Sequence, residues 1–246
     1  MSRERARRVV AWILGGIGGV LVVAVAGILV WSQVGVMAAE PEPLASVRDD
    51  PAIAYQDASV AIVLKPTDGA DEEGLVFIPG AKVDPWAYAA KLSGLVTGER
   101  MTVVITRPWL NLAFFDPRPI GEYTALAPEV DTWMVGGHSL GGVRACQLAE
   151  EADALVLFGS YCANDLSASG LPVLSISGSH DGLSTRAKIE AARPKLPADA
   201  EYIEIDGVNH ASFGDYGPQA GNGRRTIPDD EMTAKLTAVI GAFSGG

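Results

Sequence analysis

Apolar residues occur along this chain in two patterns, which predict strands and helices in alternation. Short, continuous apolar runs are typical of strands that are buried on both faces. Such runs occur at residues 60–66, 75–80, 101–108, 133–139, 154–160, 172–179 and 201–207. Apolar residues recur at helical spacing over residues 84–96, 144–152, 184–196 and 228–243. The alternation predicts an α/β fold, with a mostly parallel sheet of about six to seven strands flanked by helices.

The N-terminal part of the chain has a different pattern. From Val9 to Trp31 no residue is charged, which is a run of 23 positions. As a helix this run would measure roughly 34 Å, enough to cross a hydrocarbon core of about 30 Å. Trp12 and Trp31 lie near its two ends, and indole rings favour the membrane–water interface. We therefore expect one transmembrane helix at residues 9–31.

The charges beside this helix predict its orientation. Four arginines within residues 1–8 predict a cytoplasmic N-terminus, so that the folded domain lies on the outer side of the membrane. A cleaved signal peptide is the alternative, since "VMAAE" at residues 36–40 offers small residues for cleavage. The apolar run exceeds the roughly 7–15 residues of a signal peptide core, which favours an uncleaved anchor. Three prolines in residues 32–57 predict a tether, and residues 58–246 form the expected domain.

Net charge and cysteine content exclude several classes of function. The formal net charge is −11, which disfavours binding to nucleic acid or to anionic lipid headgroups. Cys146 and Cys162 are too few for a disulfide scaffold and form no C-x-x-C pair. In an oxidising compartment they could bond to each other, and two free thiols fit the sequence equally well. The sequence contains no metal-ligand cluster, dinucleotide fingerprint or phosphate-binding loop, so we expect no cofactor and no metal.

The stretch "WMVGGHSLGG" at residues 133–142 ends a predicted strand on a G-x-S-x-G pattern centred on Ser139. A sharp turn between strand and helix lifts the serine hydroxyl clear of the backbone. It leaves no room for a side chain two residues before or after the serine. Gly137 and Gly141 occupy those positions. The pattern predicts Ser139 as a nucleophile, and a glycine-rich strand end with an incidental serine is the alternative.

A serine nucleophile needs a base to remove its proton and a carboxylate to orient that base. With this motif, the acid and then the base are expected after later strands. Asp181 follows the predicted strand at 172–179, and His210 follows the one at 201–207. We therefore predict a catalytic triad of Ser139, Asp181 and His210. Three rivals are less well placed for these roles: Asp206, Asp215 and His180.

The negative oxygen of a tetrahedral intermediate needs two N–H donors. We predict the amide of Leu140, directly after the nucleophile, and the amide of Ala81, after the strand at 75–80. Other side chains are predicted to line the pocket: Lys82, His138, Asn111, Phe213 and Tyr216. Trp109, Asn111 and Phe114 are predicted to supply its apolar floor. No insertion long enough for a large lid follows the strand at 154–160, so we expect an open site.

Together these motifs resemble the α/β-hydrolase superfamily. More narrowly, the chain looks like the small bacterial hydrolases of α/β-hydrolase family 5, some of them membrane-anchored and labelled dienelactone-hydrolase-like. The resemblance covers roughly residue 58 to the C-terminus. It rests on "FIPGAKVDPWAYA" (77–89), "GGHSLGG" (136–142), "SISGSHDG" (175–182) and "GVNHASFGDYGPQAGNG" (207–223). It implies the α/β-hydrolase fold with Ser139 as nucleophile, Asp181 as acid and His210 as base. Dienelactone hydrolases use a cysteine nucleophile, whereas this chain has a serine.

The resulting prediction is a serine hydrolase that cleaves a carboxylic ester or a related acyl bond through an acyl-enzyme. A peptidase or an acyltransferase would use the same triad, and a non-catalytic, membrane-tethered binding domain is a third reading. The expected partners are a small-molecule or lipid-like acyl substrate and the membrane. The sequence predicts no oligomeric state.

Overall fold

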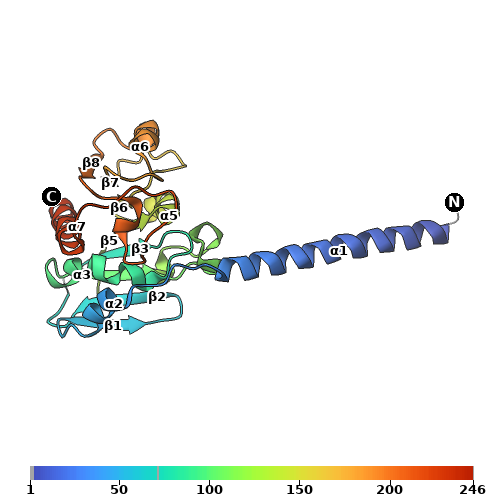
Figure 1. Ribbon diagram of the computed structural model, residues 1–246, viewed down its shortest axis with the longest axis horizontal. Coiled ribbons are helices and arrows are strands. Elements are labelled where there is room, and N and C mark those ends of the chain that lie inside the picture. Colours follow the sequence, from blue (N-terminus) through green and yellow to red (C-terminus); the bar gives the residue numbers. More distant parts are fainter. Residues whose placement is uncertain (1–2, 71, 246) are drawn as a thin grey trace. The chain divides into compact units, whose positions relative to one another are not determined.

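The computed structural model describes residues 3–70 and 72–245, and the chain divides into two units, Met1–Val36 and Met37–Gly246. The first unit is dominated by helix α1 (Arg3–Gln33), shown in blue in Figure 1. Within α1, Ala11–Gln33 has a mean hydropathy of 2.6 and is long and apolar enough to cross a membrane. This agrees with the apolar helix predicted at 9–31. A signal sequence near the N-terminus can meet the same criterion of length and apolar composition, so the helix by itself does not distinguish an anchor from a signal.

The second unit is built on one eight-stranded sheet (Figure 1). Its strands are β1 (Ile53–Asp57), β2 (Ala61–Pro66), β3 (Glu73–Ile78), β4 (Thr102–Thr106), β5 (Thr132–His138), β6 (Ala154–Phe158), β7 (Val173–Gly178) and β8 (Glu201–Ile205). Their spatial order is β1-β2-β4-β3-β5-β6-β7-β8. The pairs β1–β2 and β2–β4 are antiparallel, and all other neighbouring pairs are parallel. The predicted α/β fold with a mostly parallel sheet is confirmed.

The segment predicted as a tether is partly folded, and this corrects the expected boundary at residue 58. Helix α2 (Pro41–Arg48) begins on a proline, which the first turn of a helix tolerates because its N–H needs no partner there. Strand β1 forms the sheet edge and buries only Ile53. The prolines that predicted an extended linker therefore mark a helix start and the approach to an edge strand. This strand raises the total to eight, above the six to seven expected.

Helices cover both faces of the sheet because successive side chains of each strand point to opposite faces. Val76 of β3 belongs to one buried cluster and its neighbour Phe77 to the other. Helices α3 (Ala89–Thr97) and α7 (Asp229–Ser244) pack on the Phe77 face, and α5 (Leu140–Leu148) packs on the Val76 face. Two shorter helices complete the set, α4 (Gly121–Thr124) and α6 (Arg186–Ala192). The 3-10 helices are η1 (Pro85–Tyr88), η2 (Trp109–Asn111), η3 (Ala113–Phe115), η4 (Ala149–Glu151), η5 (Arg193–Lys195) and η6 (His210–Phe213).

A buried ion pair joins α3 to the C-terminal part of the domain. The Lys91 ammonium lies 2.5 Å from an Asp215 carboxylate oxygen and 2.9 Å from one of Asp229. Lys91 is 2% exposed and Asp215 is 4% exposed. Burial raises the pKa of Asp215, although Lys91 acts in the opposite direction. Since an unpaired charge in such a place is strongly unfavourable, the pair fixes the loop that follows η6.

Candidate active site

Ser139 occupies the sharp turn between β5 and α5. Its backbone has φ 53° and ψ −120°, a conformation that non-glycine residues rarely adopt. Its N–H donates to the Phe158 carbonyl of β6 at 3.1 Å, and its carbonyl accepts from the Ser160 hydroxyl at 2.7 Å. Strain of this kind costs on the order of 1–3 kcal/mol and persists only where the surroundings enforce it. The turn therefore has the geometry that the G-x-S-x-G pattern predicts.

The two flanking glycines are required by close backbone contacts. A Cβ on Gly137 would lie 2.5 Å from the carbonyl carbon of Gly141. A Cβ on Gly141 would lie 2.0 Å from the carbonyl oxygen of Ile78 and 2.4 Å from that of Pro79. The first turn of α5 thus packs directly against the chain that leaves β3. This contact brings the Ala81 segment next to Ser139.

Asp181 and His210, which are 29 residues apart, meet at the carboxyl end of the sheet. The His210 Nδ1 lies 2.8 Å from Asp181 Oδ2, and both side chains are buried. The other oxygen of Asp181 accepts from the N–H groups of Leu183 at 2.8 Å and Ser184 at 2.7 Å. Three hydrogen bonds therefore fix the carboxylate, and its one contact with the imidazole is at Nδ1. Nδ1 is engaged, which leaves Nε2 for a proton acceptor role.

The loop that carries His210 is held by two asparagines that the sequence analysis did not select. Asn209 caps η6 by accepting from the Ser212 N–H at 3.1 Å, and the Ser212 hydroxyl accepts from the Asn209 N–H at 3.2 Å. The His210 N–H donates to Asn222 Oδ1 at 2.8 Å. The pattern N-x-x-S at 209–212 is an N-cap signal that could have identified Asn209. Asn222 has no comparable local signal.

A second histidine, His138, lies next to His210. The rings of His138 and His210 are 4.4 Å apart, and His138 is 1% exposed. Burial lowers the pKa of His138 well below its usual value, and the neighbouring His210 adds to this effect. His138 Nδ1 lies 2.9 Å from the Tyr88 hydroxyl, which accepts from the Gly80 N–H at 3.0 Å. His138 is therefore a neutral residue that links β5 to the loop after β3.

The two amides predicted as oxyanion donors lie on facing segments. Leu140 begins α5, where the helix dipole favours negative charge. Ala81 follows β3 and Gly80, whose position is fixed by Tyr88. Within the part of the chain that the structure describes, neither the Leu140 N–H nor the Ala81 N–H donates to another protein group. Both donors are available to an oxygen bound beside Ser139.

The predicted pocket residues fall into two groups. Phe213 (1% exposed) and Tyr216 (6% exposed) are buried around the His138 ring, at centroid distances of 5.6 and 6.3 Å. Lys82 and Asn111 are half-buried and contact each other: the Lys82 N–H donates to the Asn111 carbonyl at 2.7 Å. Both have left-handed backbones, with φ of 56° and 55°.

The aromatic residues expected to form the pocket floor are exposed to solvent. Trp109 and Phe114 are 56% and 62% exposed, so the prediction that they form an apolar floor is wrong. The backbone at residues 110 and 111 turns into the left-handed region and directs this loop outward. Sequence patterns do not reveal such a turn, because neither residue is a glycine.

The rival acids and base are engaged in other contacts. His180 is exposed, and its Nδ1 lies 2.8 Å from the Arg224 carbonyl. Asp206 accepts from the Ser179 hydroxyl at 2.8 Å, and Asp215 is paired with Lys91. The structure therefore brings His210 together with Asp181 and with none of the three rivals.

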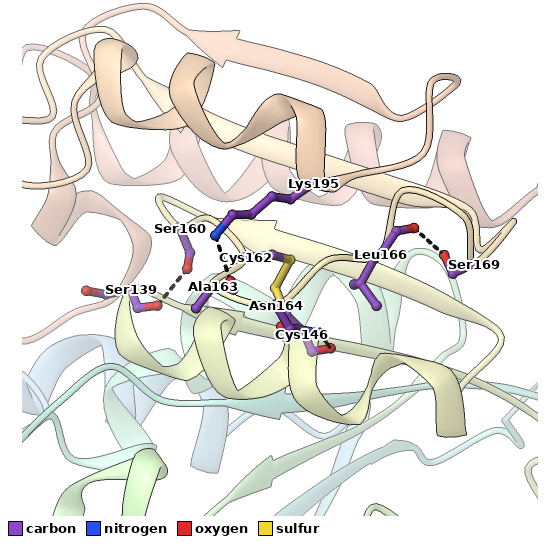
Figure 2. Close-up of a disulfide and its surroundings, with 9 residues drawn as sticks. All are labelled: Ser139, Cys146, Ser160, Cys162, Ala163, Asn164, Leu166, Ser169 and Lys195. Carbon is purple, nitrogen blue, oxygen red and sulfur yellow. Dashed lines mark hydrogen bonds between the residues drawn. A yellow bond between two sulfur atoms is a disulfide. The ribbon is translucent and has the colours of Figure 1, made fainter.

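Cys146 and Cys162 form a disulfide with a Cα–Cα distance of 5.6 Å (Figure 2). It ties α5 to the segment after β6, which also carries Ser160. The Asn164 side-chain amide donates to the Cys146 carbonyl at 3.0 Å beside it. Of the two alternatives that the sequence left open, the bonded form is the one observed. Helix α5 is thus fixed to the segment after β6 at two places: by the disulfide at Cys146, and by the hydrogen bond from Ser160 to the Ser139 carbonyl at its start.

No group of three His, Cys, Asp or Glu side chains converges as a possible metal site among residues 3–70 and 72–245.

The family model described as "Alpha/beta hydrolase family" matches residues 74–234, about two thirds of the sequence. The chain belongs to the alpha/beta hydrolase family. The match begins within β3 and ends in α7, so it includes all the residues that the geometry brings together at the carboxyl edge of the sheet.

Solved structures similar to this alpha/beta hydrolase support the same fold. The esterase domain of a Rhodothermus marinus protein is 14% identical, with a TM-score of 0.58 over 78% of this chain and 96% of that one. The protein TT1662 from Thermus thermophilus is 15% identical, with a TM-score of 0.55 over 78% and 98%. A membrane phospholipase A described as a bacterial virulence factor is 13% identical, with a TM-score of 0.54 over 99% and 100%. No curated protein matches this alpha/beta hydrolase. At these identities the similarities establish the fold alone.

Proposed function

We propose that this hydrolase cleaves a carboxylic ester or a related acyl bond, with Ser139 as nucleophile, His210 as general base and Asp181 as the group that orients the imidazole. The observation that carries the proposal is the buried hydrogen bond of 2.8 Å between His210 and Asp181. It leaves Nε2 of His210 as the proton acceptor, and Ser139 stands on a strained turn next to His138, whose ring contacts His210.

The proposed reaction proceeds in two balanced halves. Nε2 of His210 takes the Ser139 proton as Oγ attacks the carbonyl carbon, and the negative oxygen accepts from the amides of Leu140 and Ala81. His210 then gives that proton to the leaving group, so that an alcohol departs and an acyl-enzyme remains. Water repeats the sequence and releases the acid. Each oxyanion donor is expected to contribute on the order of 10²–10³ in rate.

We further propose that α1 is an uncleaved anchor and that the domain lies on the outer side of the membrane. The arginines in residues 1–8 favour a cytoplasmic N-terminus. The disulfide between Cys146 and Cys162 supports the outer location independently, because such bonds form and persist in oxidising compartments. Protease protection in sealed cells tests the orientation: cleavage of the domain from outside is expected, and its full protection would contradict it.

A fluorophosphonate probe tests the catalytic assignment. The full chain in detergent micelles is expected to be labelled at Ser139, and Ser139→Ala to be unlabelled while the fold, followed by circular dichroism, is unchanged. Asp181→Asn is expected to slow labelling by about 10⁴-fold, since the histidine loses its tautomer. A folded wild-type chain that resists the probe would leave only the non-catalytic binding domain. Release of acid from a series of esters, compared with transfer to an added amine, separates a hydrolase from an acyltransferase.

A further inference from the structure

The loop after β4 presents a cluster of aromatic side chains to solvent. We name residues 108–117 the aromatic loop. In this loop Trp109, Phe114 and Phe115 are 56%, 62% and 50% exposed, and the two phenylalanine rings are 5.8 Å apart. Single exposed apolar side chains are ordinary, whereas several gathered on one short segment indicate a surface that contacts another apolar phase.

The aromatic loop has a fixed frame that holds these rings outward. The buried Asp116 carboxylate accepts from the Trp109 N–H at 3.3 Å, from the Tyr123 hydroxyl at 3.1 Å and from the Arg118 Nε at 2.8 Å. Arg118 also donates to the Arg107 carbonyl at 2.6 Å, so both ends of the loop meet at one ion pair. These contacts and the buried Leu112 and Ala113 fix the exposed rings on a rigid base.

The backbone of the aromatic loop is also strained. Leu110 and Asn111 have φ values of 57° and 55° in succession, although neither is a glycine. For Leu110 this conformation is unfavourable by roughly 1–2 kcal/mol, whereas asparagine adopts it more readily. The strained backbone and the exposure of apolar rings to water are both unfavourable for folding. Such a combination is expected where the outward orientation of the rings serves binding.

The aromatic loop adjoins the candidate active site. The Asn111 carbonyl accepts from the Lys82 N–H at 2.7 Å, one residue after the proposed oxyanion donor Ala81. On the other side, η3 packs against α5, the helix that begins after Ser139. The exposed rings therefore stand at the rim of the site.

The membrane-proximal end of the domain reaches the same rim. The Met37 N–H donates to the Lys82 carbonyl at 2.8 Å, and the Asp84 N–H donates to the Met37 carbonyl at 2.9 Å. Between Gln33, the last residue of α1, and Met37 lie only three residues. Fully extended, this link spans at most about 14 Å, whatever the angle between the two units. Met37, and with it the loop at Lys82, is thus confined to that distance from the end of the apolar span.

We propose that the aromatic loop docks on the lipid bilayer and inserts its three rings at the membrane–water interface, so that the site takes acyl esters from the bilayer. This inference rests on the membrane anchor and hydrolase activity proposed above. Aromatic rings favour the interfacial region. The net charge of −11 opposes attraction to anionic lipid. Docking therefore depends on the rings and the short link, and it is expected on neutral phosphatidylcholine.

The test places a fluorophore on the aromatic loop of the full chain in phosphatidylcholine vesicles. Because both cysteines are in the disulfide, Phe114→Cys supplies one thiol for an environment-sensitive dye. Thr132→Cys is the matched control, since Thr132 is exposed at the amino end of β5, away from the rim. Lipid that carries a nitroxide in its acyl chain is expected to quench the dye at position 114 and leave it unchanged at 132. If Phe114→Cys misfolds, Phe115→Cys provides the same readout.

The outcomes separate this inference from the proposals beneath it. Equal quenching at both positions, or none at 114, would overturn docking. The dye at 114 could also become shielded as protein density rises, without responding to the nitroxide lipid. That result would mean that the rings contact a second copy of the chain, and it would also overturn docking. Resistance to alkaline extraction reports on the anchor, and fluorophosphonate labelling of the same vesicles reports on Ser139. If the chain resists extraction and is labelled at Ser139 but shows no quenching at 114, then docking is refuted while the anchor and the catalytic assignment stand.

Discussion

Replacing Gly141 by alanine tests whether the contact between α5 and the chain after β3 sets the geometry of the site. The new Cβ would lie 2.0 Å from the Ile78 carbonyl oxygen and 2.4 Å from that of Pro79. Real Cβ atoms essentially never approach another heavy atom closer than 3.0 Å. Both obstacles are main-chain atoms, so no side-chain rotation relieves the clash. The two segments must separate by about 1 Å, and the amides of Leu140 and Ala81 move apart with them.

A displacement of this size is sufficient to impair catalysis without unfolding the domain. A misplacement of about 1 Å lowers reaction rates by about 10²-fold. Overpacking at a tight contact destabilises a fold by about 1–3 kcal/mol, which a domain of this size tolerates. We expect the rate of p-nitrophenyl acetate hydrolysis by the full chain to fall about 10²-fold in Gly141→Ala, with a small loss of thermal stability.

Gly121→Ala is the matched control, because a Cβ at Gly121 meets nothing within 4 Å. It is expected to keep wild-type activity and stability. The reasoning is refuted if Gly141→Ala has the fold and melting temperature of the wild type and also hydrolyses the ester at the wild-type rate. Loss of activity in Gly121→Ala would equally show that the effect is not specific to the contact.

Three further predictions concern stability, each measured by urea unfolding of the full chain in detergent. Lys91→Met leaves the buried Asp215 without its cation and is expected to destabilise the domain by about 3–5 kcal/mol; a loss below 1 kcal/mol would contradict the argument. Removing the disulfide with Cys146→Ala and Cys162→Ala, which closes a loop of sequence separation 16, is expected to destabilise by about 3 kcal/mol, and an unchanged midpoint would refute this. Because burial depresses the pKa of His138 in the folded state, the unfolded chain binds the extra proton below about pH 6.5, and stability falls there as pH falls, by up to about 1.4 kcal/mol per unit. His138→Asn is expected to remove this part of the slope between pH 6.5 and 5.5, and an unchanged slope would contradict it.

Local patterns were sufficient to predict the central strands and the turn at Ser139. Strands β5, β6 and β7 are almost wholly buried, so nearly every residue in them is apolar or small and the runs are easily recognised; His138 at the end of β5 is the exception. The glycines at 137 and 141 are determined by contacts with nearby backbone, and their spacing is visible in the sequence. The edge of the sheet was harder, because β1 buries a single residue and carries no such run.

The contacts that hold the candidate site in place could not be predicted. Tyr88 and His138 are separated by 50 positions, and Lys91 and Asp215 by 124. Neither pair has a local signal, since a tyrosine or lysine in a helical pattern is as readily explained by the helix itself. The outward direction of Trp109 depends on a left-handed backbone at two non-glycine residues, which only the three-dimensional structure reveals.

The strand order also determines which parts of this enzyme can change independently. Ser139 follows β5, whereas Asp181 follows β7 and His210 follows β8, two and three strands away. Neighbouring strands are about 4.8 Å apart, so β8 lies roughly 14 Å from β5, and the chain after β8 must double back toward β5 for the His210 imidazole to approach Ser139. The loops after β3 and β4 lie on the opposite side of β5 and take no part in that return path. The loop after β4 can therefore change without altering the path that joins the loops after β7 and β8, whereas the loop after β3 is constrained by its close backbone contact with Gly141.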